Sequence, residues 1–334
     1  MLKQAQNPDL YHGRRKKDRF FEGWYFKLVD AACKNVYIFI PGISLGLGGQ
    51  DAHSFVQVFD GSSGAFEYIS FPKGAFEASL DKFRFKVEKN TFSREGIWLD
   101  LKGSDFSISG GLSFTDTVGW PDSKGSPGSM GYYNYIPLME CYSQVCAMDL
   151  RLVGSLLING KPIDFTGGRG YIEKNWGRAF PLGWIWVQCN NFRDESIALS
   201  ASIGHVPFVV GSFRGFLIGL WVRGIFLEFS TMKKSLLDIK RDKDRVIIRV
   251  ENRTHILKVD LDTSKALFIN LKGPKDGAMV PLVDETVQGI VGIGLEEKNK
   301  GGGGHTRGNK VLVSDTGRCG GVEFGGEQML IADP

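Results

Sequence analysis

Residues 171–192 carry more side chains capable of acid–base and aromatic chemistry than any other stretch of this sequence. Glu173, Lys174 and Asn175 stand side by side, Trp176 follows them, and the stretch holds three of the seven Trp residues. A carboxylic acid can give or take a proton, an amide can hold a ligand oxygen, and an indole face attracts a cation. The pattern indicates a binding or catalytic site, although the same residue types also suit a solvated turn beside a packed core.

The end of this stretch reads as a strand with two different faces. Because successive side chains of a strand point to opposite sides, Trp184, Trp186, Gln188 and Asn190 share one face. The residues between them are Ile, Val and Cys, so the other face is apolar. One side is therefore suited to a core, and the aromatic and amide side is suited to the wall of a cavity.

Two other segments repeat the pairing of an acid or amide with an aromatic ring. Strand parity places Glu22 beside Trp24 near the start of the chain and Glu140 beside Tyr142 in its middle. We expect these strands to converge on the interior of a β-barrel that is roomy enough for one elongated ligand.

Strand signals dominate the rest of the chain. Alternating apolar residues predict hairpins at 56–70, 153–165 and 246–261, and no long segment shows a 3.6-residue period. The second hairpin turns at Asn159-Gly160, a dipeptide that readily takes the two positive φ values of a type I′ turn. We therefore predict an all-β protein with little helix, built from two β-barrel or sandwich halves packed together.

A segment rich in Gly, Pro and Ser, residues 119–134, is the predicted internal boundary. It divides the chain into a basic N-terminal arm at 1–19, a first half at 20–125 and a second half at 126–334 that carries the EKNWG and WIWVQCN motifs. Two halves that pack tightly would count as one unit.

Composition and charge exclude several classes of protein. A net charge of +4 over 334 residues, without a basic recognition helix, argues against a nucleic-acid partner. Five Cys without a CxxC pair favour free thiols in a reducing compartment, and the five His lack metal-ligand spacing, so no metal site is predicted.

The N-terminal sequence predicts a cytoplasmic protein. Its first ten residues contain no apolar run typical of a signal peptide, and the longest apolar stretch, 206–229, is interrupted by two Arg and four Gly. The basic run at 14–17 precedes several aromatic residues, a pattern compatible with peripheral contact between the arm and an anionic membrane surface.

Three motifs resemble the tocopherol cyclase family: FFEGWYFK, IPLMECYSQVCAMDL and above all YIEKNWGRAFPLGWIWVQCN. Weaker similarity at His53-Ser54-Phe55 and at residues 317–321 extends the resemblance over most of the chain. The resemblance implies lipocalin-like β halves and a cofactor-free enzyme that closes a chroman ring on a prenylated hydroquinone. The chain lacks the transit peptide of the plant enzymes, and this predicts a bacterial relative.

That chemistry assigns roles to the residues singled out above. A buried carboxylic acid protonates an alkene, indole faces shield the tertiary cation, and a phenolic oxygen then attacks it. We predict Glu173 as the acid, with Glu140 or Glu22 as the alternative. The predicted ligand contacts are the cation-shielding and oxygen-holding side chains His53, Trp24, Tyr142, Lys174, Asn175, Trp176, Trp184, Trp186, Gln188 and Asn190.

Two alternatives share the same fold. A non-catalytic lipocalin-like protein would bind a prenyl quinone or another lipid in a Phe- and Trp-lined cavity, with every carboxylate held in an ion pair. An isoprenoid hydratase would begin with the same protonation but add water to the cation. The enzyme hypothesis, of the isomerase or lyase class, requires a small hydrophobic isoprenoid or quinol ligand and at least one buried carboxyl group that faces the cavity and lies outside an ion pair.

Overall fold

The computed structural model describes residues 2–137, 139–208, 211–299 and 309–327. Within these ranges nearly all regular structure is β-strand, arranged in two antiparallel sheets. The helical segments there are the short α1 (Leu2–Gln6) and the single 3₁₀ turns η1 (Gly13–Arg15), η2 (Leu47–Gly49), η3 (Lys73–Ala75) and η4 (Gly131–Tyr135). The predicted all-β class with little helix is confirmed.

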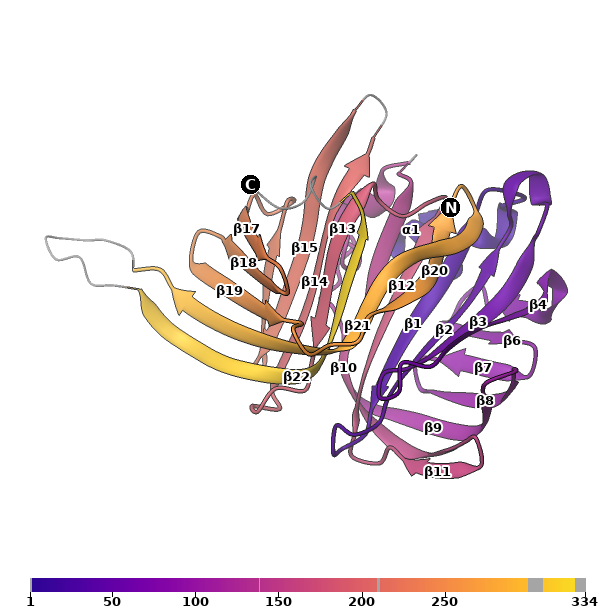
Figure 1. The fold of residues 1–334 in the computed structure, drawn as a ribbon. Coiled ribbons are helices and arrows are strands. Elements are labelled where there is room, and N and C mark those ends of the chain that lie inside the picture. The colour runs from indigo at the N-terminus through magenta and orange to yellow at the C-terminus, as the bar shows by residue number, and fades with distance from the viewer. Residues whose placement is uncertain (1, 138, 209–210, 300–308, 328–334) are drawn as a thin grey trace, which may run out of the picture. The chain divides into compact units, whose positions relative to one another are not determined.

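The first sheet contains twelve strands among the described residues, in the spatial order β4-β3-β2-β1-β12-β10-β9-β8-β7-β6-β5, with β11 paired to β10 (Figure 1). Their bounds are β1 Phe21–Val29, β2 Val36–Ser44, β3 His53–Asp60, β4 Phe66–Pro72, β5 Phe76–Ala78, β6 Arg84–Val87, β7 Asn90–Ser93, β8 Gly96–Lys102, β9 Ser107–Val118, β10 Cys141–Ile158, β11 Lys161–Asp164 and β12 Arg169–Gly177.

The second sheet contains ten described strands in the order β16-β15-β14-β13-β22-β21-β19-β18-β17, with β20 paired to β21. Their bounds are β13 Gly183–Cys189, β14 Ile197–Pro207, β15 Ser212–Val222, β16 Ile225–Ser230, β17 Leu236–Asp242, β18 Arg245–Glu251, β19 His255–Asp262, β20 Ile269–Lys275, β21 Ala278–Glu297 and β22 Lys310–Gly326.

All three predicted hairpins are present. Strands β3 and β4 pair from Phe59 opposite Phe66, and β18 pairs with β19. Strands β10 and β11 join through Asn159 and Gly160, whose φ values of 50° and 77° are those that the predicted type I′ turn requires. Local alternation and turn chemistry were sufficient to place these hairpins.

Contacts between residues divide the chain into two compact units. The first unit is Met1–Pro181, Val206–Ser212 and Phe268–Glu285, and the second is Leu182–His205, Phe213–Leu267 and Thr286–Pro334. The division differs from the boundary expected near 119–134, because β10 and β12 pair with β9 and β1 of the same sheet. A Gly- and Pro-rich segment there interrupts the strands without separating two units.

The first sheet curves around one hydrophobic core. Buried residues from β1–β4, β6–β10 and β12 form a single cluster in which Trp24 stacks on Phe85 at 4.0 Å between ring centroids, and Phe26 lies 5.4 Å from Phe92. The alternate side chains of β1 are long and aromatic, so they reach strands at the far end of the sheet. Aromatic packing therefore fills this part of the interior of the first sheet.

The second unit builds its own core from alternating strand residues. Val246, Ile248 and Val250 of β18 are buried, as are Leu257 and Val259 of the paired β19. This is the period-2 pattern of a sheet with one buried face. None of the described helices combines the length and the apolar character that crossing a membrane would require.

Candidate functional site

The pairing of β1 with β12 brings two of the sequence motifs together. Trp24 lies opposite Lys174, and Glu22 lies opposite Trp176. Strand alternation puts these four side chains on one face of the sheet, and all four are at most 5% exposed. Residues separated by about 150 positions thus form one compact group.

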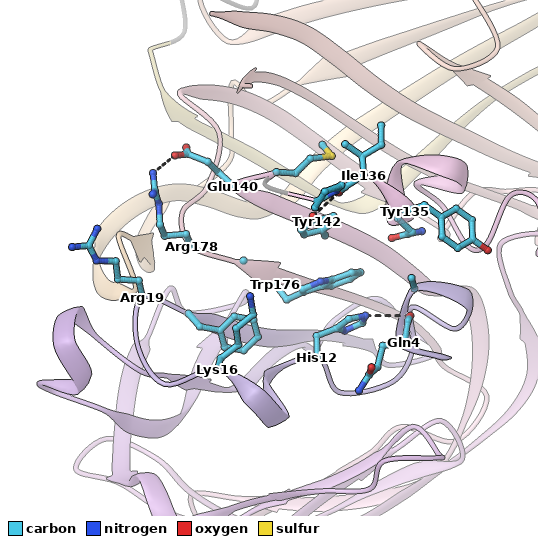
Figure 2. A pocket seen from close by; sticks show the side chains of 16 residues that line it. Gln4, His12, Lys16, Arg19, Tyr135, Ile136, Glu140, Tyr142, Trp176 and Arg178 are labelled. Atoms are coloured by element: carbon cyan, nitrogen blue, oxygen red, sulfur yellow. Dashed lines mark hydrogen bonds and ion pairs between the residues drawn. The ribbon is translucent and has the colours of Figure 1, made fainter. Parts of the chain in front are cut away.

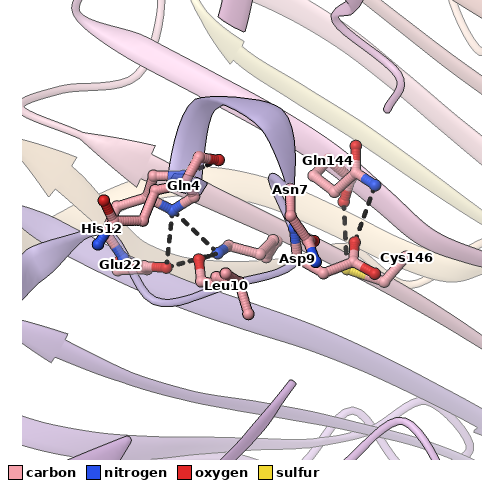
Figure 3. A network of polar contacts seen from close by, with 9 residues as sticks. Gln4, Asn7, Asp9, Leu10, His12, Glu22, Gln144 and Cys146 are labelled. Atoms are coloured by element: carbon pink, nitrogen blue, oxygen red, sulfur yellow. Dashed lines mark hydrogen bonds and ion pairs between the residues drawn. The ribbon is translucent and has the colours of Figure 1, made fainter. Parts of the chain in front are cut away.

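A buried ion pair is the centre of this group. The Lys174 ammonium lies 2.6 Å from Glu22 Oε1, donates to the carbonyl oxygen of Leu10 at 2.6 Å, and lies 3.2 Å from His12 Nδ1. The backbone N–H of His12 donates to the other Glu22 oxygen at 2.8 Å. Figure 3 shows this network beneath the N-terminal segment. Every N–H of the ammonium therefore has an acceptor.

These contacts fix the charge states. Burial by itself raises the pKa of Glu22, but the charge of the Lys174 cation and its hydrogen bond, together with the neighbouring His12, outweigh it, so this pKa lies below its usual value. Burial and the Lys174 charge together lower the pKa of His12, although Glu22 acts against them. His12 is accordingly neutral at pH 7, with Nδ1 accepting from Lys174 and Nε2–H directed at the carbonyl oxygen of Gln4, 3.4 Å away.

Trp176 separates this buried charge from a cavity. Its indole is stacked between His12, at 4.0 Å and 9°, and Tyr142, at 5.4 Å and 7° (Figure 2). Lys174 Nζ lies 4.7 Å from the centre of the same ring, a distance at which a cation and an indole attract each other. The rings of His12, Trp176 and Tyr142 thus form one continuous wall, and the buried Lys174 ammonium contacts this wall on the side away from the cavity.

The cavity has a volume of about 710 Å³, within the range of small-molecule sites. Figure 2 shows its wall and rim. The side chains around it come from the N-terminal segment, the η4 region, the start of β10 and the end of β12. They include His12, Lys16, Arg19, Phe20, Ile136, Met139, Glu140, Tyr142, Trp176 and Arg178. Glu140 forms an ion pair with Arg178 at this rim.

The opposite face of β1 and β12 carries a second buried polar group. The Tyr171 hydroxyl donates to Glu173 at 2.6 Å, and Ser143 donates to the other Glu173 oxygen at 2.9 Å. The Tyr25 hydroxyl donates to Glu285, and the Tyr25 and Tyr171 rings meet edge to face at 6.4 Å. The two Glu and two Tyr side chains are at most 7% exposed.

Strand geometry explains how these groups meet. Tyr25 lies directly opposite Glu173 in the antiparallel register, and Tyr171 is two residues away on the same face. Asn175 also belongs to this face, where its amide lies 3.4 Å from Glu173. A carboxyl group excluded from water and held by hydroxyl donors has the properties of a positioned general acid or base.

The structure separates the predicted site residues into several places. Glu140, Tyr142 and Trp176 line the cavity, Glu22 and Lys174 lie behind its wall, and Trp24 belongs to the aromatic core. Glu173 and Asn175 are on the opposite face. His53 is elsewhere in the first unit, with Nε2 at 2.6 Å from the Tyr68 hydroxyl and Nδ1 beside the carbonyl of Asp51.

Four predicted ligand contacts belong to the second unit. Trp184, Trp186 and Gln188 are buried on β13, and Asn190 follows that strand. The Trp184 indole N–H donates to Glu323 at 3.1 Å across the β13–β22 pair. The aromatic and amide face predicted for this strand is present there, and the ligand contacts assigned to it stay predictions.

Sequence reasoning did not find His12 or Glu285. His12 lies in the segment that we predicted as a basic N-terminal arm, and Leu10 of that segment is 1% exposed. Glu285 lies in β21, outside every motif that the sequence analysis used, and no local signal marks it. Tyr25 and Tyr171 stand inside recognised motifs, where a hydroxyl beside a buried acid was a usable signal.

Comparison with known proteins identifies relatives of this chain. The family described as tocopherol cyclase-like matches residues 89–326. A probable chloroplastic tocopherol cyclase from Oryza sativa subsp. japonica is 28% identical over 372 aligned positions, which cover 95% of this chain and 77% of the rice protein. A chloroplastic tocopherol cyclase from Zea mays is 28% identical over 214 positions, covering 62% of this chain and 44% of that protein.

Solved structures share the fold at low identity. A putative AttH from Nitrosomonas europaea is 16% identical, with a TM-score of 0.51 and 92% of each chain covered. CghA is 9% identical, with a TM-score of 0.55, covering 92% of this chain and 88% of its own. At these identities the likeness concerns the fold and not the chemistry.

Proposed function

The chain belongs to the tocopherol cyclase-like family, and from that premise we propose that it is a cofactor-free cyclase of a prenylated hydroquinone or a related isoprenoid. The observation that carries the proposal is the buried pair of carboxyl groups, Glu173 and Glu285, each accepting a hydrogen bond from a tyrosine. Acid-initiated ring closure needs such a group, because a carboxylic acid must be positioned at the alkene and burial favours its protonated form.

The reaction is an isomerisation in which protons balance. Glu173 gives its proton to the less substituted alkene carbon, which leaves a tertiary cation on its neighbour. The phenolic oxygen forms the new C–O bond and releases its own proton, which Glu285 can accept through Tyr25. The two tyrosine rings, 6.4 Å apart, lie within the group that would surround the cation. One proton enters and one leaves, so no external reactant is consumed.

The other predicted acids are less suited to this step. Glu22 pairs with Lys174 and its pKa lies below the usual value, so it is a carboxylate at neutral pH. Glu140 is bound to Arg178 at the cavity rim, where its side chain is 23% exposed. Glu173 is held in the dry interior by the hydroxyl groups of Tyr171 and Ser143, and a hydroxyl oxygen can also accept a hydrogen bond from the protonated acid.

The test is anaerobic incubation of the purified protein with a reduced phytyl-benzoquinol in D₂O, followed by liquid chromatography with mass detection. We expect a chroman that carries one carbon-bound deuterium, because the acid exchanges its proton with solvent before transfer. A product heavier than the substrate by one water would assign a hydratase instead. Quinol that stays bound to the protein without conversion would favour a lipid carrier.

Two variants locate the acid. Glu173→Gln should lower turnover by about 10²- to 10⁴-fold, since it removes the transferable proton and keeps the size of the side chain. Glu140→Gln is the matched control and should stay within about threefold of the wild type, because a rim ion pair is no part of the proton path. Turnover that survives Glu173→Gln but not Glu140→Gln would move the reaction to the cavity.

A further inference from the structure

The cavity at the end of β12 combines a hydrocarbon wall with a cationic rim. The cavity has a volume of about 710 Å³, and its apolar wall is formed by Phe20, Ile136, Met139, Tyr142 and Trp176. Such a volume suits a ligand body of drug-like size, and the stacked rings favour planar or unsaturated groups. The proposed cyclisation does not use this space, because Glu173 lies on the opposite face of β12.

Three cations surround the opening of the cavity. Lys16 and Arg19 are exposed on the loop after η1, and Lys16 Nζ lies 5.9 Å from the Phe20 ring. Arg178 reaches the rim from the end of β12 and pairs with Glu140 and with Asp276, which is not part of the lining. His12 also lines the cavity, and it adds no charge because its pKa is lowered and the imidazole is neutral. Arg178 thus already has two carboxylate partners, and Lys16 and Arg19 are the lining cations outside the described ion pairs.

The cavity is preformed, because its N-terminal side is fixed to the sheet. Asp9 accepts a hydrogen bond from Gln144 at 2.9 Å (Figure 3). It accepts another from Arg94 at 2.7 Å. Lys174 holds the carbonyl of Leu10, and Tyr142 donates to the carbonyl of Ile136 at 2.8 Å. A ligand entering this space would spend little free energy on ordering the protein.

We propose that this cavity binds an amphiphile with a phosphate monoester head and an unsaturated hydrocarbon body. A phosphate monoester carries nearly two negative charges at pH 7, which suits the two rim cations Lys16 and Arg19, and guanidinium groups bind phosphate through paired hydrogen bonds. The body then lies along Tyr142 and Trp176. A free phosphorylated isoprenoid and the head of phosphatidic acid share this chemistry.

Isothermal titration calorimetry with farnesyl monophosphate tests the proposal, with farnesol and inorganic phosphate as the two halves of the ligand. Farnesyl monophosphate should bind at least about tenfold more tightly than either half. Sedimentation with phosphatidylcholine vesicles, with and without phosphatidic acid, distinguishes a membrane lipid from a free phosphorylated isoprenoid as the natural ligand. Selective binding to vesicles that contain phosphatidic acid assigns a membrane lipid. Binding of farnesyl monophosphate without vesicle binding assigns a free metabolite. Farnesol binding as tightly as its phosphate would overturn the proposal.

Variants connect binding to this cavity. The double variant Lys16→Ala/Arg19→Ala should weaken farnesyl monophosphate binding at least about tenfold, whereas Lys17→Ala, an exposed neighbour outside the lining, should change it less than twofold. Equal affinity in the double variant and the wild type would refute the site. Glu173→Gln should bind normally, so failure of the cyclase proposal and failure of this one can be told apart.

Discussion

Replacing Lys174 by Met tests whether the buried ion pair supports the N-terminal segment and the wall of the cavity. Lys174 and Glu22 are fully buried and 2.6 Å apart. The substitution keeps the length of the side chain but leaves the Glu22 carboxylate without its cation, and it removes the donor to the carbonyl of Leu10. Breaking a buried pair in this way costs about 3–5 kcal/mol of unfolding free energy.

The double variant Glu22→Gln/Lys174→Met separates charge from packing. It leaves no uncompensated charge, so we expect it to be at least about 2 kcal/mol more stable than the sum of the two single losses predicts. The exposed pair Lys86–Glu77, at 3.0 Å, is the matched control. Lys86→Met should cost less than about 1 kcal/mol, because water screens that pair.

Urea unfolding at pH 7.5, followed by tryptophan fluorescence, measures these differences. Trp24 and Trp176 lie 5.2 Å and 4.7 Å from the Lys174 ammonium, so fluorescence reports on the same region. A loss below about 1 kcal/mol for Lys174→Met, or strictly additive losses in the double variant, would show that the pair does not hold this region together.

Two further predictions concern pH and backbone shape. Because burial and Lys174 lower the pKa of His12 from 6.5, the unfolded chain binds a proton below that pH that the native chain does not bind, and stability should fall as the pH drops below about 6.5. In urea titrations at several pH values, His12→Gln should abolish this fall in stability. The variant should still lose stability below about pH 4.5, because the pKa of Glu22 is lowered in the native chain. Gly177→Ala should lower the free energy of unfolding by about 1–3 kcal/mol, because φ is 147° and the new Cβ would lie 2.1 Å from the carbonyl oxygen of Glu140. The control Gly74→Ala, which has open space around it, should leave stability unchanged. Equal melting temperatures for the two variants in thermal unfolding would contradict the reasoning.

Local patterns were enough for much of the fold. Alternation at 246–261 and the Asn159-Gly160 turn predicted hairpins that are present, because each depends on residues close in sequence. The boundary predicted at residues 119–134 differs from the division into two compact units. A composition rich in Gly and Pro indicates a local break in regular structure. It does not report that β12 returns to pair with β1.

The candidate site was predictable in its residue types and not in its grouping. Parity within FFEGWYFK correctly put Glu22 and Trp24 on one face. The same argument could not say that Trp24 would be enclosed by Phe85 or that His12 would meet Glu22, because those contacts depend on the curvature of the sheet and the path of the first twelve residues.

The sequence by itself determined the β class, the hairpins, the family and the residues able to do acid and aromatic chemistry, because propensity, parity and motif identity are properties of short stretches. Tertiary structure alone decided which acid is a carboxylate, which acid is held by hydroxyl groups, and which aromatic rings line a cavity. Glu22 and Glu173 each stand beside a Trp or Tyr in sequence, yet one meets a buried ammonium and the other meets Tyr171 and Ser143. Their chemistry differs because a pKa and a cavity wall depend on neighbours brought from distant strands.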